Sequence, residues 1–97
     1  MLNNKEVYDK LMEVSTKINQ AVKSYADGEI IVEKFINDLW AIHSKLNSLN
    51  YENAQAIRQD PKLTRITRTL FEEIFKYLNQ HINTKPNKEE KEEEIFF

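Results

Sequence analysis

The sequence contains no cysteine, only one glycine and only two prolines among its 97 residues. Without cysteine the chain has no disulfide, no thiolate ligand for a metal and no cysteine nucleophile. A single glycine argues against sandwiches, barrels and Rossmann folds, which need many tight turns, and it rules out a glycine-rich phosphate loop. These absences favour an all-helical fold.

Long apolar runs are missing as well. The longest of them, at residues 30–32 and 39–42, hold only a few residues, whereas a membrane-spanning helix needs about 20. Residues 1–6 lead into mixed charge and not into the apolar segment of a secretory signal. Hydrophobic residues still make up 40% of the chain, which is enough for a compact core. We therefore expect a soluble, cytoplasmic protein without a membrane span.

Apolar residues recur at alternating spacings of four and three, which is the pattern of amphipathic helices. This spacing predicts long helices over about residues 4–26, 29–48 and 61–83, and a short helix over about residues 50–59. Because the joins between them are short, sequential helices should be antiparallel. We expect an all-α antiparallel helical bundle of three long helices and one short helix, in one domain of residues 1–85.

Capping residues mark several of the expected helix ends. Asn3 and Glu6 have the spacing of a capping box, and Gly28 suits the left-handed conformation that often ends a helix. Asp27 or Gly28 is the expected N-cap of the second helix. At Asp60-Pro61 the aspartate is a capping residue, and the proline fits the first helical position.

The second helix is apolar over more than half of its circumference, because Ile31, Ile36, Trp40 and His43 widen its stripe. A helix of this kind should contact two or more neighbours. We therefore expect it at the centre of the bundle, with Trp40 in the core. On the short helix, Tyr51 is expected to belong to the apolar stripe.

The composition changes near the end of the sequence, where Pro86 should stop the fourth helix. Residues 86–97 form an expected acidic flexible tail, since five glutamates crowd into six positions, repel one another and favour disorder. The tail ends in Ile95-Phe96-Phe97, and these apolar residues could dock in a groove on the same molecule or on another one. The acidic run could also contact Arg65 and Arg68 and screen their positive charge. The alternative is a frayed end with no role.

Groups that could catalyse a reaction are few. The only histidines, His43 and His81, lie on or beside apolar stripes, and no His-x-x-x-His or Glu-x-x-His metal motif is present. A boundary histidine with its polar edge in water is the usual case. We therefore predict that the chain is not an enzyme and holds no metal or cofactor.

The most unusual polar feature is a basic cluster around the start of the fourth helix. It includes every arginine of the chain and consists of Arg58, Lys62, Arg65 and Arg68. Cations at a helix N-terminus oppose the helix dipole, which suggests a use such as binding a phosphate or an acidic partner. The alternative is a solvated face paired with Glu72, Glu73 or Asp60. The isoelectric point near 5.7 argues against nucleic acid as the partner.

The stretch IVEKFINDLW at residues 31–40, followed by residues 46–51, resembles the middle of the pediocin-like (class IIa) bacteriocin immunity proteins. The length, the missing cysteine and the long-long-short-long order of the helices are also similar. The resemblance implies a cytosolic four-helix bundle that protects its producer from a bacteriocin. In that family, protection involves a membrane-bound sugar-transporter receptor, and the C-terminal half determines which bacteriocin is recognised. The fourth helix and the tail would therefore carry specificity here.

Two functional hypotheses follow from the sequence. The first is a non-enzymatic protein-interaction module, such as an immunity protein with a membrane-associated protein target. Its binding residues would be those of the basic cluster together with Ile95, Phe96 and Phe97. The second is a self-associating helical regulatory protein of phage or plasmid type that contacts nucleic acid through the basic helix edge. The first hypothesis predicts a monomer and the second a homodimer.

Overall fold

The computed structural model describes residues 2–82, and they form four helices. The helices are α1 (Asn4–Ala26), α2 (Val32–Glu52), α3 (Ala54–Gln59) and α4 (Pro61–Ile82). No strand occurs in this part of the chain. The predicted all-α class, with three long helices and one short one, is therefore confirmed. The predicted acidic tail, with Ile95, Phe96 and Phe97, lies outside the described residues.

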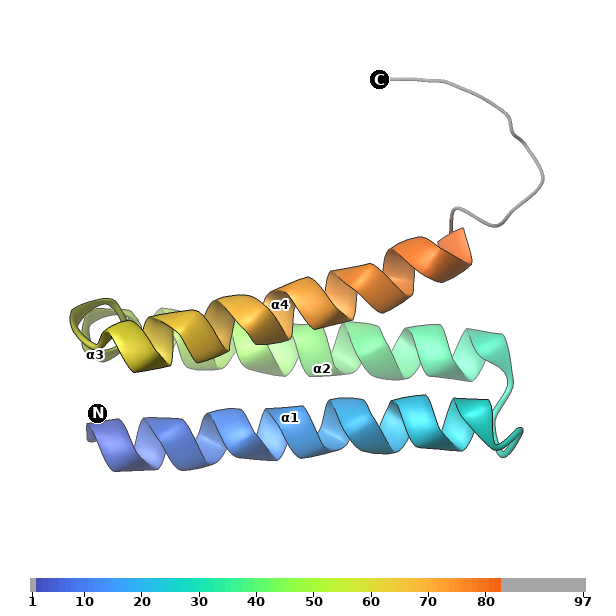
Figure 1. Ribbon diagram of the computed structural model, residues 1–97, viewed down its shortest axis with the longest axis horizontal. Helices are drawn as coiled ribbons and strands as arrows, with labels where there is room; N and C mark the ends of the chain where they lie inside the picture. The colour runs from blue at the N-terminus through green and yellow to red at the C-terminus, as the bar shows by residue number, and fades with distance from the viewer. Residues whose placement is uncertain (1, 83–97) are drawn as a thin grey trace, which may run out of the picture.

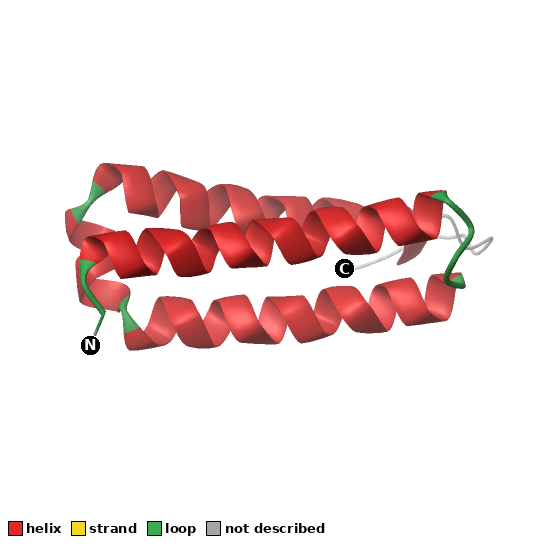
Figure 2. Cartoon of the chain, turned by 90° about the horizontal axis from the view of Figure 1, so that it is seen from below, coloured by secondary structure: helices red, strands yellow, loops and turns green. Residues whose placement is uncertain are grey.

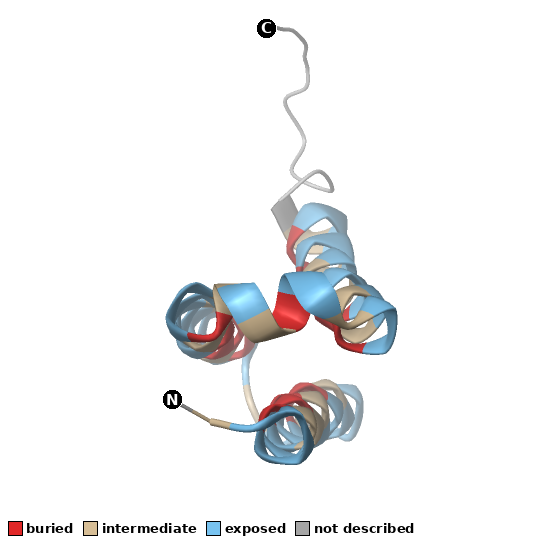
Figure 3. Cartoon of the chain, turned by 90° about the vertical axis from the view of Figure 1, so that its left-hand side faces the viewer, coloured by how far each residue is buried: buried red, intermediate tan, exposed pale blue. Residues whose placement is uncertain are grey.

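The three long helices pack in a triangle, and α3 lies across one end of it (Figure 3). Each long helix runs antiparallel to the one before it, so α1 and α4 run in the same direction (Figure 1). Each of the three contacts the other two, and α3 contacts all of them. The second helix is therefore not at the centre of the bundle, contrary to expectation, because α1 and α4 also contact both of the other long helices. Short joins connect the helices, as predicted (Figure 2).

The core is built from the apolar stripes that the sequence predicts. Its side chains are less than a tenth exposed, and every helix contributes to it. They are Val7, Leu11, Val14, Ile18 and Ala21 of α1, Phe35, Leu39, Ile42 and Leu46 of α2, Ile57 of α3, and Leu63, Leu70, Ile74 and Leu78 of α4. Thr67 also lies in the core, and its hydroxyl has no hydrogen-bond partner among residues 2–82.

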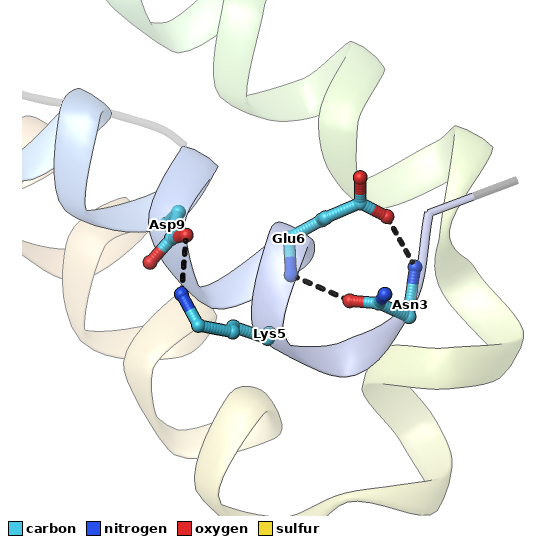
Figure 4. A network of polar contacts seen from close by, with 4 residues as sticks. All are labelled: Asn3, Lys5, Glu6 and Asp9. Carbon is cyan, nitrogen blue, oxygen red and sulfur yellow. Dashed lines mark hydrogen bonds and ion pairs between the residues drawn. The ribbon is translucent and has the colours of Figure 1, made fainter.

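The predicted capping box begins α1. The backbone N–H of Glu6 donates to Oδ1 of Asn3 over 2.9 Å, and the backbone N–H of Asn3 donates to Oε1 of Glu6 over 3.0 Å (Figure 4). One turn further on, an ion pair of 3.3 Å joins Lys5 to Asp9. The box satisfies two backbone donors that the first turn of a helix otherwise leaves without partners.

The turn after α1 differs from the prediction. Gly28 has the expected positive φ of 76°, but neither Asp27 nor Gly28 caps α2, whose N-cap is Ile31. The backbone N–H groups of Gly28 and Glu29 donate back to the carbonyl oxygens of Tyr25 and Ser24. This closure belongs to a Schellman motif, in which a left-handed residue ends the helix. Because residues 27–29 close α1, α2 begins three residues later than predicted.

The join between α2 and α3 lies later than predicted too. Asn53, which is 3% exposed, donates both its backbone N–H and its side-chain amide to the carbonyl of Leu49. Its backbone leaves the helical region, with φ −123° and ψ 27°. Residue 53 therefore ends α2 and begins α3. The expectation that Tyr51 belongs to the apolar stripe of the short helix is wrong, because Tyr51 lies in α2 and is 84% exposed.

Asp60 caps α4 as predicted. Its Oδ1 accepts the backbone N–H of Lys62 over 3.0 Å, and its Oδ2 accepts the side-chain amide of Asn4 over 3.2 Å. The second bond joins the first turn of α1 to the first turn of α4. It therefore helps to fix the end of the bundle where α3 lies.

An aromatic cluster joins the three long helices at the opposite end. The ring of Phe35 stacks on Tyr25 of α1 with a centroid separation of 4.6 Å. It meets Tyr77 and His81 of α4 edge-on, at 6.2 and 5.3 Å. Phe35 is only 1% exposed. One side chain of α2 therefore contacts both neighbouring helices, and we call these four residues the Phe35 cluster.

We expect Phe35→Ala to lower the free energy of unfolding by about 3–5 kcal/mol, because it leaves a cavity where three helices meet. The matched control is Phe75→Ala, which removes the same ring from a position that is 41% exposed. The control should cost about 1 kcal/mol. Urea unfolding followed by far-UV circular dichroism measures both values. Equal losses for the two variants would contradict the role of the Phe35 cluster.

Candidate binding surface

Four aromatic side chains form a surface between α2 and α4, which we call the aromatic patch. It consists of Trp40 and His43 of α2 and Phe71 and Phe75 of α4. The ring of His43 lies at its centre, 5.5 Å from Trp40, 5.5 Å from Phe71 and 5.1 Å from Phe75. Trp40 is 45% exposed and Phe75 is 41% exposed. Two large aromatic rings therefore remain open to solvent on one side of the bundle.

Helical spacing explains why these residues share a surface. Trp40 and His43 are three positions apart on α2, and Phe71 and Phe75 are four apart on α4, so each pair lies on one face of its helix. On α2 the same side continues through Ile36, which is half-buried. The apolar surface thus extends toward the end of the bundle where α2 begins and α4 ends (Figure 1).

The prediction that Trp40 lies in the core is wrong. In a triangle of helices each helix has only two long neighbours, and Leu39, Ile42 and Leu46 already fill the inward side of α2. Trp40 follows Leu39 directly, so it is turned by about 100° away from the core. The exposed Ile31 shows the same limit at the N-cap of α2, since it is 67% exposed. The apolar stripe of α2 is wider than the bundle can bury.

The two histidines occupy different parts of the bundle. His43 is half-buried in the aromatic patch, and His81 is half-buried in the Phe35 cluster, where it meets Tyr25 at 5.0 Å. The boundary position expected for both is confirmed. Within residues 2–82, no group of three or more histidine or carboxylate side chains is arranged to hold a metal ion.

All four residues of the basic cluster are exposed. The predicted alternative, in which they pair with Asp60, Glu72 or Glu73, is not found in the described part of the chain. The ion pairs there are Lys5–Asp9, Lys23–Asp27 and Lys34–Asp38. Arg58, Arg65 and Arg68 therefore have no acidic partner among residues 2–82.

The structure divides the basic cluster between two edges of α4. The Nζ atom of Lys62 lies 5.1 Å from the ring centroid of Tyr8, on the side of α1. Arg68 precedes Phe71 by three positions and Phe75 by seven, so it shares their side of the helix, toward α2. Arg68 therefore shares the side of α4 that carries Phe71 and Phe75, Lys62 lies at the other edge, and Arg65 lies one turn before Arg68, between the two.

A separate groove lies between α1 and α2. Its volume is about 490 Å³, and its cationic lining residues are Lys17, Lys34 and Lys45. Lys34 is already paired with Asp38 at 3.1 Å. The groove is open and has no histidine in its lining, so it lacks the group that most often transfers protons in catalysis.

None of the helices within residues 2–82 is both long and apolar enough to cross a membrane. No protein-family model, curated protein or solved structure matches the chain. The fold therefore rests on the structure itself, and the resemblance of residues 31–40 to bacteriocin immunity proteins stays a prediction.

We expect the double variant Arg65→Gln/Arg68→Gln to keep its stability within about 0.5 kcal/mol, because both side chains are exposed and pair with no described carboxylate. Thermal and urea unfolding by circular dichroism measure the change. A loss well above this value would show that the arginines stabilise the bundle, and it would remove them from the candidate surface.

Proposed function

We propose that the chain is a non-catalytic protein-binding module whose contact surface is the aromatic patch together with Arg65 and Arg68. The observation that carries the proposal is the pair of exposed rings, Trp40 and Phe75, with Arg68 on the same side of α4 as Phe75. Neither Arg68 nor Arg65, one turn before it, has an acidic partner within residues 2–82. Tryptophan, tyrosine and arginine are enriched among the residues that dominate binding energy at protein interfaces. Exposed apolar surface of this kind usually marks an interaction site.

The side chains of this surface indicate which kind of partner it would bind. The rings of Trp40 and Phe75 favour an apolar or aromatic anchor, which would lose water on both sides of the contact. Arg65 and Arg68 favour carboxylates beside that anchor, since a guanidinium presents a planar fork that matches a carboxylate. The expected partner is therefore an acidic segment that carries at least one large apolar side chain.

The second hypothesis, nucleic-acid binding by a self-associating protein, has less support. A nucleic-acid surface needs a basic excess, whereas the first 87 residues hold 12 basic and 11 acidic side chains. The division of Lys62 and Arg68 between two edges of α4 also disperses the positive charge. What favours this hypothesis is the exposure of the four cations.

Site-specific photo-crosslinking in the native host tests the proposal. A benzophenone amino acid placed at Phe75 should give a protein adduct, whereas the same probe at Thr16, exposed on α1, should give none. The adduct at Phe75 should weaken in the Arg65→Gln/Arg68→Gln background, because the partner is acidic. Equal adducts at both positions would contradict the proposed surface. Adducts to nucleic acid would favour the second hypothesis.

We further propose bacteriocin immunity as the setting of this binding, with the chain acting in the cytoplasm. Its support is the resemblance of residues 31–40, which include Trp40, and the long-long-short-long helix order. Expression in a strain sensitive to a class IIa bacteriocin should raise survival, and Trp40→Ala/Phe75→Ala should abolish the protection. The variant's circular dichroism spectrum serves as the control for folding. Failure to protect against a panel of these bacteriocins would overturn the immunity proposal and leave the binding surface to be judged by crosslinking.

A further inference from the structure

We infer that the aromatic patch is the docking site of the chain's own residues 89–97, so that the chain covers its binding surface until a partner displaces this segment. The inference rests on the proposed function, because it assigns an internal competitor to the same surface. In this segment five glutamates precede Ile95, Phe96 and Phe97. It therefore has the composition expected of the partner, namely carboxylates beside large apolar side chains.

The position of α4 places this segment within reach. Residues 83–97 follow Ile82, at the end of the bundle toward which the apolar surface of α2 extends. Phe75 lies seven residues before Ile82, or about 10 Å along the helix axis, and Arg68 lies about 21 Å before it. Fifteen residues span at most about 50 Å when extended. The segment can therefore reach both the rings and the arginines without any change in α4.

Charge favours the same pairing. The excess of acidic residues in the chain lies in residues 88–97, which contain five glutamates and only two lysines. Arg65 and Arg68 are exposed and have no carboxylate partner within residues 2–82. An acidic run docked beside them gains attraction that salt would screen.

Covalent attachment strengthens this contact. A segment joined to its site by a short chain binds as if it were present at about millimolar concentration. An outside partner must then compete with the docked segment. It needs a higher affinity or a higher concentration than it would need at an uncovered patch. The docked segment would thus set a threshold for partner binding.

Trp40 is the only tryptophan of the chain, so its fluorescence reports directly on the patch. The test compares the full chain with the full-length variant Phe96→Ala/Phe97→Ala. The matched control, Asn87→Ala/Lys88→Ala, changes two residues outside the proposed contact. The first variant should shift Trp40 emission to longer wavelength and raise its acrylamide quenching constant roughly two-fold, because docked side chains exclude water. The control should match the parent chain.

The charged part of the contact has its own test. Arg65→Glu/Arg68→Glu should raise the quenching constant as the phenylalanine variant does, and adding Glu93→Arg/Glu94→Arg should restore the parent value. High salt should also raise quenching in the parent chain. Unchanged quenching in both the phenylalanine and the arginine variants would overturn the inference.

Protein concentration separates this contact from one between two copies. Quenching that is independent of dilution, in a chain that light scattering shows to be a monomer, supports docking within one molecule. A dimer whose Trp40 becomes exposed on dilution would overturn the inference and make a second copy the occupant.

Crosslinking at Phe75 separates the two proposals. Partner adducts should increase in Phe96→Ala/Phe97→Ala, because the competitor is gone. If partner adducts form but Phe96→Ala/Phe97→Ala leaves the quenching of Trp40 unchanged, the docking of the segment is refuted and the protein-binding function is not. Changes at Trp40 with no partner adduct, even in the phenylalanine variant, would refute the protein-binding function alone.

Discussion

The arrangement of the bundle depends on Phe35, the one side chain of α2 that meets aromatic rings of both α1 and α4. Its stacking on Tyr25 and its edge-on contacts with Tyr77 and His81 hold three helices together at one end. At the other end, Asp60 joins α1 to α4 with polar groups, because it accepts hydrogen bonds from the side chain of Asn4 and from the backbone of Lys62. Between these two ends, aliphatic side chains fill the space. The triangle is therefore fixed at both ends, and its width is set by ordinary packing.

A triangle limits how much apolar surface a helix can bury. Each long helix has two long neighbours, so a stripe that covers more than half of a helix must leave part of itself in water. On α2 this part includes Trp40 and Ile31, and on α4 it includes Phe75. The aromatic patch is thus a consequence of apolar stripes that are wider than the surface a three-helix bundle can bury. A fourth long helix would have covered it, but α3 is only 6 residues long and lies across the end.

Much of the fold could be predicted from the sequence, because local signals determined it. The four-and-three spacing located the stripes, Asn3 with Glu6 marked the start of α1, and Asp60-Pro61 marked the start of α4. The errors occurred where a distant or competing contact decided the outcome. The backbone N–H groups of Gly28 and Glu29 donate back to α1 and end that helix. The second helix therefore begins only after Ile31, which provides no side-chain cap. The buried amide of Asn53 ends α2, four residues later than predicted.

The candidate site was predicted only in part. The sequence located the cations of α4, but it could not show that Lys62 contacts the ring of Tyr8, away from the side of α4 that Arg68 shares with Phe71 and Phe75. The aromatic patch was missed because Trp40 and Phe75 flank apolar stripes, and a flanking aromatic residue is usually buried. The signal that could have found it is the excess width of the stripe on α2. Comparing that width with the two neighbours available in a three-helix bundle would have indicated exposed rings.

The order of the helices has a consequence for how the surface arises. The α1–α2 pair is joined by a short turn and can form from local contacts, which are made early in helical proteins. Contacts of α1 with α4 must close a loop that includes all of α2 and α3, and this closure carries an entropic cost. The stacking of Phe35 on Tyr25 can therefore precede its contacts with Tyr77 and His81. An α1–α2 hairpin would already carry Trp40 and His43 but not Phe71 and Phe75, so the complete surface exists only once α4 has docked and folding is finished.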